Sequence, residues 1–190
     1  AYNLLAVFAT SIILGLDELS TLKKISQLEG VPGRFQTFYT QNNIMIIIDY
    51  AHTPDALKNI LSSIDKIRTK NENLLTIIGC GGDRDKKKRP KIGEVAAKFS
   101  SKVIFTSDNP RNEDPELIIE EMIRGVSPVD YKKTSIVIKR DEAISTAYKL
   151  SIPGDIVLIA GKGHESFQEI KGKKYPFNDL EYARKIFTKT

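Results

Sequence analysis

Four short clusters of polar and glycine residues carry the side chains of this sequence that could do chemistry. They combine carboxylates, guanidinium groups and amides, which bind charged small molecules through ion pairs and hydrogen bonds. Both histidines of the chain also lie in these clusters. The clusters are residues 49–52 (DYAH), 79–85 (GCGGDRD), 107–111 (SDNPR) and 161–165 (GKGHE).

Each cluster directly follows a short run rich in Ile, Leu and Val, which predicts a strand buried on both faces. Ligands of open α/β sheets bind beyond the carboxyl ends of the parallel strands, so the four clusters are predicted to line one cleft. The competing interpretation makes each cluster an ordinary strand-to-helix turn, where Gly, Asn, Asp and Pro are common. The occurrence of four such clusters together favours the cleft.

Alternating strands and helices predict the fold class, an α/β domain with a doubly wound, mostly parallel sheet. Two further short segments with a glycine between them predict a hairpin near the C-terminus. The expected strands are 44–48, 74–78, 103–106, 135–138 and 156–160, the hairpin strands are 167–170 and 174–177, and the helices are 54–68, 90–99, 114–124, 141–149 and 182–187.

Composition excludes several classes of protein. The 190 residues are 41% hydrophobic with a formal net charge of +5, which excludes a disordered chain and suits anionic ligands, but indicates no nucleic-acid partner. The single cysteine, Cys80, excludes an internal disulfide and fits a small residue in a tight glycine turn in a reducing cytoplasm. Residues 4–16 are apolar but fewer than the about 20 of a membrane span, so they are predicted to be a buried helix within a helical segment, 1–28.

Three weaker patterns have simpler interpretations. Gly161-Lys162 resembles the end of a phosphate-binding loop, but Gly163 replaces the required Ser or Thr. Two histidines and one cysteine match no metal-ligand spacing, so no metal site is predicted. The basic run 86–89 could attract phosphate, but neighbouring aspartates offset its charge and favour a solvated loop.

Six motifs occur in the same order as in the Mur ligases of peptidoglycan synthesis, and they resemble the MurE branch of that family. The resemblance implies that residues 1–33 end a central ATPase domain and that residues 34–190 form the C-terminal amino-acid-binding domain. The motifs are residues 31–35 (VPGRF), 49–57 (DYAHTPDAL), 79–85 (GCGGDRD), 88–90 (KRP), 108–111 (DNPR) and 161–165 (GKGHE).

The resemblance implies a bacterial cytoplasmic enzyme that forms an amide bond at the expense of ATP. The substrates would be ATP, UDP-MurNAc-L-Ala-D-Glu and meso-diaminopimelate, joined through an acyl phosphate. Mg²⁺ would be bound mainly by the central domain, whose phosphate-binding loop lies outside this sequence.

Site residues follow from the same resemblance. Two arginines would bind the carboxylates of diaminopimelate, and Glu165 would bind an ammonium group; the competing interpretation pairs both arginines with nearby aspartates. Positions matching ATP contacts are Asn3, Arg34 and Asp49, with His52 beside them in no specific role, and positions matching diaminopimelate contacts are Arg84, Asn109, Arg111, Gly161 and Glu165, with Asp108 and Pro110 completing the motif.

Other functions remain open at this point. A MurE-type ligase could add lysine or ornithine instead of diaminopimelate, although the motif 108–111 favours diaminopimelate. A non-catalytic αβ module that binds an anionic small molecule is the alternative from another class.

Residues 1–190 alone are expected to fold but to catalyse no ligation. Residues 34–190 contain a full set of strands and helices and enough apolar residues for a core. Thermal unfolding followed by circular dichroism should therefore be cooperative, while ATP-dependent amide formation should be undetectable. Ligation by these residues without another protein would contradict the interpretation.

Overall fold

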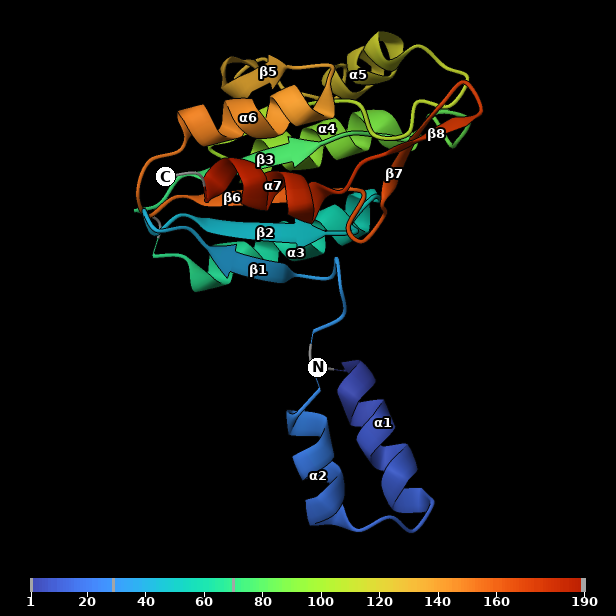
Figure 1. Ribbon diagram of the computed structural model, residues 1–190. Helices are drawn as coiled ribbons and strands as arrows, with labels where there is room; N and C mark the ends of the chain where they lie inside the picture. Colours follow the sequence, from blue (N-terminus) through green and yellow to red (C-terminus); the bar gives the residue numbers. More distant parts are fainter. Residues whose placement is uncertain (1, 29, 70, 189–190) are drawn as a thin grey trace. The chain divides into compact units, whose positions relative to one another are not determined.

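The computed structural model describes residues 2–28, 30–69 and 71–188 (Figure 1). It divides into two compact units, Ala1–Val31 and Pro32–Thr190, each described here by itself. The division falls two residues before the boundary that the sequence predicts, after Gly33.

The small unit consists of two helices, α1 (Tyr2–Ile13) and α2 (Glu18–Ser26). Gly15, at φ +80°, interrupts the predicted helical segment, and the Asp17 carboxylate caps α2 by accepting the Ser20 N–H at 2.8 Å.

The prediction that residues 4–16 form a buried helix is wrong for this structure. Leu5 is 62% exposed and Ile13 is 84% exposed. A pair of helices buries only the stripe along which the helices meet, so the apolar side chains elsewhere around α1 stay in solvent.

A six-stranded sheet forms the centre of the large unit (Figure 1). Its order is β1-β2-β6-β3-β4-β5, and every neighbouring pair is parallel except β1 with β2. The strands are β1 (Gln36–Tyr39), β2 (Met45–Asp49), β3 (Leu74–Ile78), β4 (Lys102–Phe105), β5 (Thr134–Ile136) and β6 (Ile156–Ala160). The five predicted strands are confirmed within two residues, whereas β1, a short edge strand with alternating exposure, was not predicted.

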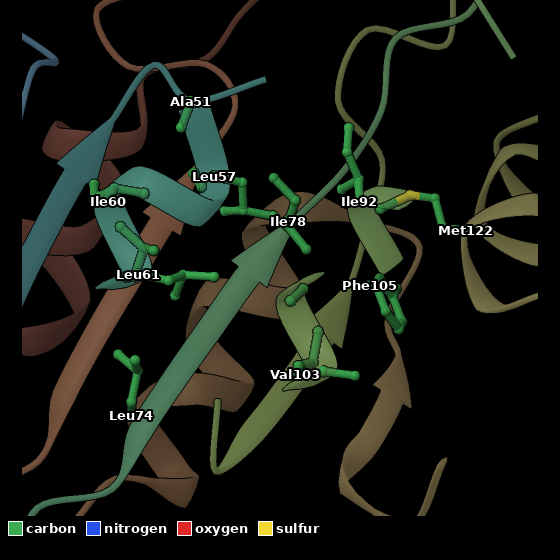
Figure 2. Packing of buried hydrophobic residues seen from close by; sticks show 14 of the residues in the cluster. Ala51, Leu57, Ile60, Leu61, Leu74, Ile78, Ile92, Val103, Phe105 and Met122 are labelled. Carbon is green, nitrogen blue, oxygen red and sulfur yellow. The ribbon is translucent and has the colours of Figure 1, made fainter. Parts of the chain in front are cut away.

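Helices cover both faces of this sheet, which confirms the doubly wound α/β fold. One core lies against α3 (Pro54–Ile67), α4 (Lys88–Phe99) and α5 (Pro115–Ile123) (Figure 2). The other lies against α6 (Arg140–Leu150) and α7 (Asp179–Phe187). Neighbouring residues of β2 point to opposite cores, Ile47 to the first and Ile46 to the second, as expected for a strand buried on both faces.

Side-chain caps begin two of these helices. The Thr53 hydroxyl accepts the Ala56 N–H at 3.2 Å and Pro54 begins α3, while the Asn178 side chain accepts the Glu181 N–H at 3.0 Å. α4 begins two residues before the predicted Pro90.

The predicted hairpin is confirmed as β7 (Phe167–Ile170) and β8 (Lys173–Pro176), a separate two-stranded sheet. A short 3₁₀ turn, η1 (Tyr131–Lys133), precedes β5. Within residues 2–28, 30–69 and 71–188, no helix is both long and apolar enough to cross a membrane.

A buried ion pair joins the two helices of the second core. Arg140 Nε and Nη2 each lie 2.7 Å from an oxygen of Asp179, and Nη2 also donates to the Ala160 carbonyl oxygen at the end of β6. Both side chains are fully buried. The pair therefore ties α6 and α7 to the strand end that precedes residues 161–165.

Asp179→Asn should destabilise the large unit by about 3–5 kcal/mol, because it leaves the Arg140 charge buried without its partner. Urea unfolding followed by circular dichroism measures the loss. The matched control is Glu142→Gln, which removes the exposed Lys139–Glu142 pair at the start of α6, the helix of Arg140. It should leave the urea midpoint nearly unchanged. Equal midpoints for the two variants would contradict the role given to the buried pair.

Candidate functional site

The last residues of four strands stand in one row. The parallel register pairs Asp49 with Ala160 and Ile78 with Phe105, and Ile77 lies opposite Ile159, one residue before the row. The loops that follow these strands therefore leave from the same edge of the sheet.

These loops enclose a cavity of about 360 Å³, which confirms the prediction of a single cleft. All four polar clusters contribute to it. The lining residues are Tyr50, His52, Gly79, Cys80, Gly81, Arg84, Lys88, Asp108, Asn109, Arg111, Gly161 and Glu165.

Most residues that the resemblance assigns to diaminopimelate meet in this cavity. Pro110 does not line it and instead lines a second cavity of about 710 Å³, which Arg111 also borders. Of the positions assigned to ATP, His52 lines the first cavity. Asn3 is an exposed residue of α1 in the small unit.

Lys162 organises the acidic side of the cavity, a role that the sequence interpretation did not give it. Its side chain is fully buried, and Nζ donates to Asn109 Oδ1 at 3.0 Å and to Glu165 Oε2 at 2.8 Å. Asn109 Nδ2 donates to the same Glu165 oxygen at 2.9 Å. These bonds fix the orientation of the Asn109 amide, and Oε1 is the Glu165 oxygen that receives neither of them.

Two carboxyl groups of the cavity have shifted pKa values. Burial raises the pKa of Asp108 above its usual value, although the charges of Arg140 and Lys162 oppose the shift. Burial would also raise the pKa of Glu165, but hydrogen bonds from Lys162 and Asn109 outweigh it and lower that pKa. Glu165 therefore stays ionised beside the cationic side chains of the same cavity.

Arg111 is held by the C-terminal hairpin. Its N–H donates to the Glu169 carbonyl oxygen at 3.0 Å, and its own carbonyl accepts the Lys171 N–H at 2.7 Å. Nε lies 3.2 Å from a Glu169 carboxylate oxygen, and Nη1 donates to the Gly82 carbonyl oxygen at 2.8 Å. The ion-pair partner is thus Glu169 rather than one of the aspartates considered from the sequence, and Nη2 lies outside these bonds.

Arg84 has a different setting. Its side chain is exposed, and its Nη1 donates only weakly to the Asp83 carbonyl oxygen at 3.5 Å. The guanidinium of Arg84 is therefore less restrained by the protein than that of Arg111.

Asp49 fixes the backbone just before β1 and just after β2. Its Oδ2 accepts the Phe35 N–H and its Oδ1 accepts the Ala51 N–H, both at 2.8 Å. Phe35 has a positive φ of +46°, so this contact supports a strained backbone next to Arg34. The Arg34 guanidinium lies 5.1 Å from the centre of the Tyr50 ring.

The Tyr50 ring contacts the rings of both histidines, His52 and His164. Its ring centre is 4.7 Å from that of His52 and 5.3 Å from that of His164, and its carbonyl oxygen lies 2.9 Å from His52 Nδ1. Arg34, His52 and His164 thus surround one aromatic ring at the rim of the cavity.

The interpretation of residues 86–89 as a solvated loop is wrong at its end. Lys88 begins α4, and Arg89 is fully buried, where it contacts Glu113 and Glu121 at 2.8–2.9 Å. A charge run alone does not show which cation a carboxylate from a distant segment will neutralise.

Cys80 is a packing residue, as predicted. It is 3% exposed, and burial raises its pKa to about 12, so the thiol stays protonated and unreactive. Among the described residues, no three His, Cys, Asp or Glu side chains are grouped so that they could hold a metal ion.

Gly82 lets two loops of the site approach closely. Its N–H donates to the Asn109 carbonyl oxygen at 2.9 Å, and a Cβ at this position would lie 1.9 Å from the Pro110 carbonyl oxygen. Residues 79–85 and 107–111 are therefore in direct backbone contact, and a side chain between them would force them apart.

Several known proteins are similar to this chain in sequence and in fold. A family model described as "Mur ligase, glutamate ligase domain" matches residues 33–163. The UDP-N-acetylmuramoyl-L-alanyl-D-glutamate–2,6-diaminopimelate ligase of Cytophaga hutchinsonii is 52% identical over 179 residues, which cover 94% of this chain and 37% of that protein. The protein of the same name from Parabacteroides distasonis is 46% identical over 188 residues, or 99% of this chain and 39% of that protein.

A solved structure of a ligase with the same name is also similar. It has a TM-score of 0.76 and 38% identity, and the match covers 97% of this chain and 37% of that one.

Fold and site together define a doubly wound α/β domain with a small-molecule cavity at the carboxyl edge of its sheet. The chain belongs to the Mur ligase family. It spans between 37% and 39% of the length of the two curated relatives named above.

Gly82→Ala should destabilise the large unit by about 1–3 kcal/mol, because the new methyl group overlaps the Pro110 carbonyl oxygen. Urea unfolding measures the change, and hydrogen exchange at the residue-82 amide should become faster. Gly30→Ala is the control, since a Cβ at Gly30 meets nothing within 4 Å. If Gly82→Ala matched Gly30→Ala in both measurements, the two loops would not be in the close contact described.

Proposed function

We propose that this chain is the amino-acid-binding part of a longer ATP-dependent ligase of the MurE type. The enzyme would join meso-diaminopimelate to UDP-MurNAc-L-Ala-D-Glu during peptidoglycan precursor synthesis in the bacterial cytoplasm. The observation that carries this proposal is the cavity in which Arg84, Arg111 and Glu165 meet, in a chain 46–52% identical to ligases named for this reaction.

Charge complementarity supports diaminopimelate as the amino acid. This substrate carries two carboxylates and two ammonium groups. The guanidinium groups of Arg84 and Arg111 would each bind a carboxylate, and Glu165 Oε1 would accept a hydrogen bond from an ammonium group. Lysine and ornithine have a single carboxylate, so either would leave one arginine without its anionic partner.

The proposed reaction forms the amide bond in two steps. The D-Glu carboxylate oxygen attacks the γ-phosphorus of ATP, ADP leaves, and an acyl phosphate forms. The substrate nitrogen then attacks the carbonyl carbon as the free amine and loses one proton to solvent. The new C–N bond replaces the C–O bond to phosphate, which leaves as inorganic phosphate. The residues of this chain would orient the attacking amine through contacts with the two carboxylates and with the ammonium group that does not react, which raises the effective concentration of the nucleophile.

Nucleotide contacts are proposed for Asn3, Arg34, Asp49 and His52. A guanidinium at Arg34 suits phosphate oxygens, and the contact between Asp49 and the Phe35 N–H would fix the backbone beside it. Mg²⁺, which prefers oxygen ligands and the phosphates of a nucleotide, would be held mainly by the central domain.

Phosphate release by the full-length enzyme tests the proposal. With ATP and UDP-MurNAc-L-Ala-D-Glu present, diaminopimelate, lysine and ornithine are supplied in parallel. Release that depends on diaminopimelate supports the proposal, and release with lysine or ornithine alone reassigns the amino acid. Absence of release with all three would favour the non-catalytic module.

Arg111→Ala should weaken the use of diaminopimelate by roughly 10- to 150-fold, because a charge-assisted contact with a carboxylate is lost. The change should appear mainly in the KM for diaminopimelate if the contact is equal in ground and transition states. Arg111→Lys should restore little, since an ammonium group lacks the planar fork.

The KM for ATP serves as the internal control for these variants and should barely move. A diaminopimelate KM within twofold of the unmodified enzyme, together with a raised ATP KM, would contradict the placement of Arg111 in the amino-acid pocket.

A further inference from the structure

Arg89 lies at the centre of a buried ionic network beside the cavity. Its side chain is fully buried at the start of α4, and Nη1 and Nη2 donate to the two carboxylate oxygens of Glu113 at 2.9 and 2.8 Å. Nη1 also donates to Glu121 at 2.8 Å, and Nη2 to the Gly81 carbonyl oxygen at 3.2 Å. The network joins α4, α5 and the loop of residues 79–85.

Glu113 extends this network to the second loop of the cavity. It lies two residues after Arg111, and its Oε1 accepts the N–H of Asp83 at 2.6 Å from the other loop. Lys86 Nζ lies 3.1 Å from Oε2. Hydrogen bonding from Arg89 is the main reason that the pKa of Glu113 falls to about 2, so the carboxylate is ionised at any ordinary assay pH.

The contact between Glu113 and Asp83 stabilises a backbone conformation that residues other than glycine rarely adopt. Asp83 has a φ of +53°, and it immediately precedes Arg84. Its own carboxylate accepts a hydrogen bond from Asn112 Nδ2 at 2.8 Å, which ties it again to the loop of Arg111. The direction in which Arg84 leaves its loop is thus fixed by residues that follow Arg111.

We propose that Glu113, held by Arg89, is a positioning residue that sets the separation of the two loops that carry Arg84 and Arg111, and thereby limits the length of dicarboxylic amino acid that both guanidinium groups can bind. The inference rests on the proposed function for the identity of the ligand. Glu113 itself lines the second cavity and is not among the residues lining the first, so it acts through the two loops.

Glu121 provides a matched control for Glu113. Both carboxylates contact Arg89 at similar distances, and their side chains are 18% and 26% exposed for Glu113 and Glu121 respectively. Among the described residues, Glu121 makes no hydrogen bond to either loop, because it reaches Arg89 from within α5. Neutralising Glu121 removes one charge from the same arginine and leaves the Glu113–Asp83 contact in place.

The test compares Glu113→Gln with Glu121→Gln in the full-length enzyme. Glu113→Gln should raise the KM for diaminopimelate roughly 5- to 30-fold, with kcat and the KM for ATP little changed. The amide keeps one oxygen for the Asp83 N–H but loses the charge and the second oxygen through which Arg89 holds it, so the contact is weakened rather than removed. Glu121→Gln should leave all three within about twofold. Removing a negative charge by itself would favour a dicarboxylate, so weaker binding by Glu113→Gln reports geometry and not charge.

Hydrogen exchange at the Asp83 amide gives a second readout that needs no substrate. Exchange should be faster in Glu113→Gln than in the unmodified protein and unchanged in Glu121→Gln. Unchanged exchange and an unchanged KM in Glu113→Gln would overturn the inference, as would equal increases of the KM in both variants.

The same experiments distinguish a failure of the proposed function from a failure of this inference. If the unmodified enzyme releases phosphate with lysine or ornithine but not with diaminopimelate, the selection of a dicarboxylic amino acid by length is overturned, and the exchange at Asp83 decides only whether Glu113 positions the loop. If it releases none with any of the three, the proposed function is wrong and the exchange at Asp83 alone decides whether Glu113 positions the loop.

Discussion

The parallel pairing of β2, β6, β3 and β4 is the constraint on which the cavity depends. These strands are buried on both faces, so a shift of one residue in any pair would turn its apolar side chains toward the wrong core. The register that results aligns Asp49, Ala160, Ile78 and Phe105 at one edge of the sheet. Every loop of the cavity therefore begins at the same edge of the sheet, where hydrogen-bonded pairing and side-chain packing together fix the alignment.

Above this rigid edge, three loops contain non-glycine residues with positive φ. They are Phe35, Asp83 and Arg111, and such conformations cost roughly 1–3 kcal/mol each. In each case the amide of the strained residue donates to an acidic residue from another segment: Asp49, Glu113 and the main chain of Glu169. These contacts offset the strain, and they also place Arg34, Arg84 and Arg111 beside the cavity.

Charge inside the cavity is balanced by groups that lie behind it. Lys162 and Arg140, both fully buried, face Asp108 and Glu165 from the protein side. Because this neutralisation is internal, Glu165 remains an anion that can receive an ammonium group from the open side. A small molecule that carries both carboxylate and ammonium groups fits such an arrangement better than a simple anion does.

The sequence by itself determined five strands of the parallel sheet, their helices and the cleft. Runs of apolar residues and polar strand ends are local signals, although the fifth of these strands, β5, is not buried. The sequence did not determine which cations remain available to a ligand. Arg89 and Lys162 look like solvated or phosphate-binding residues in sequence, yet both are buried against carboxylates, some of them more than 20 positions away. It also failed at residues 4–16, whose apolar side chains suggest burial but stay exposed on α1, and at the edge strand β1. Only the tertiary structure decides such pairings, since an ion pair or a buried face depends on which segments the fold brings together and not on the residues beside it in the chain.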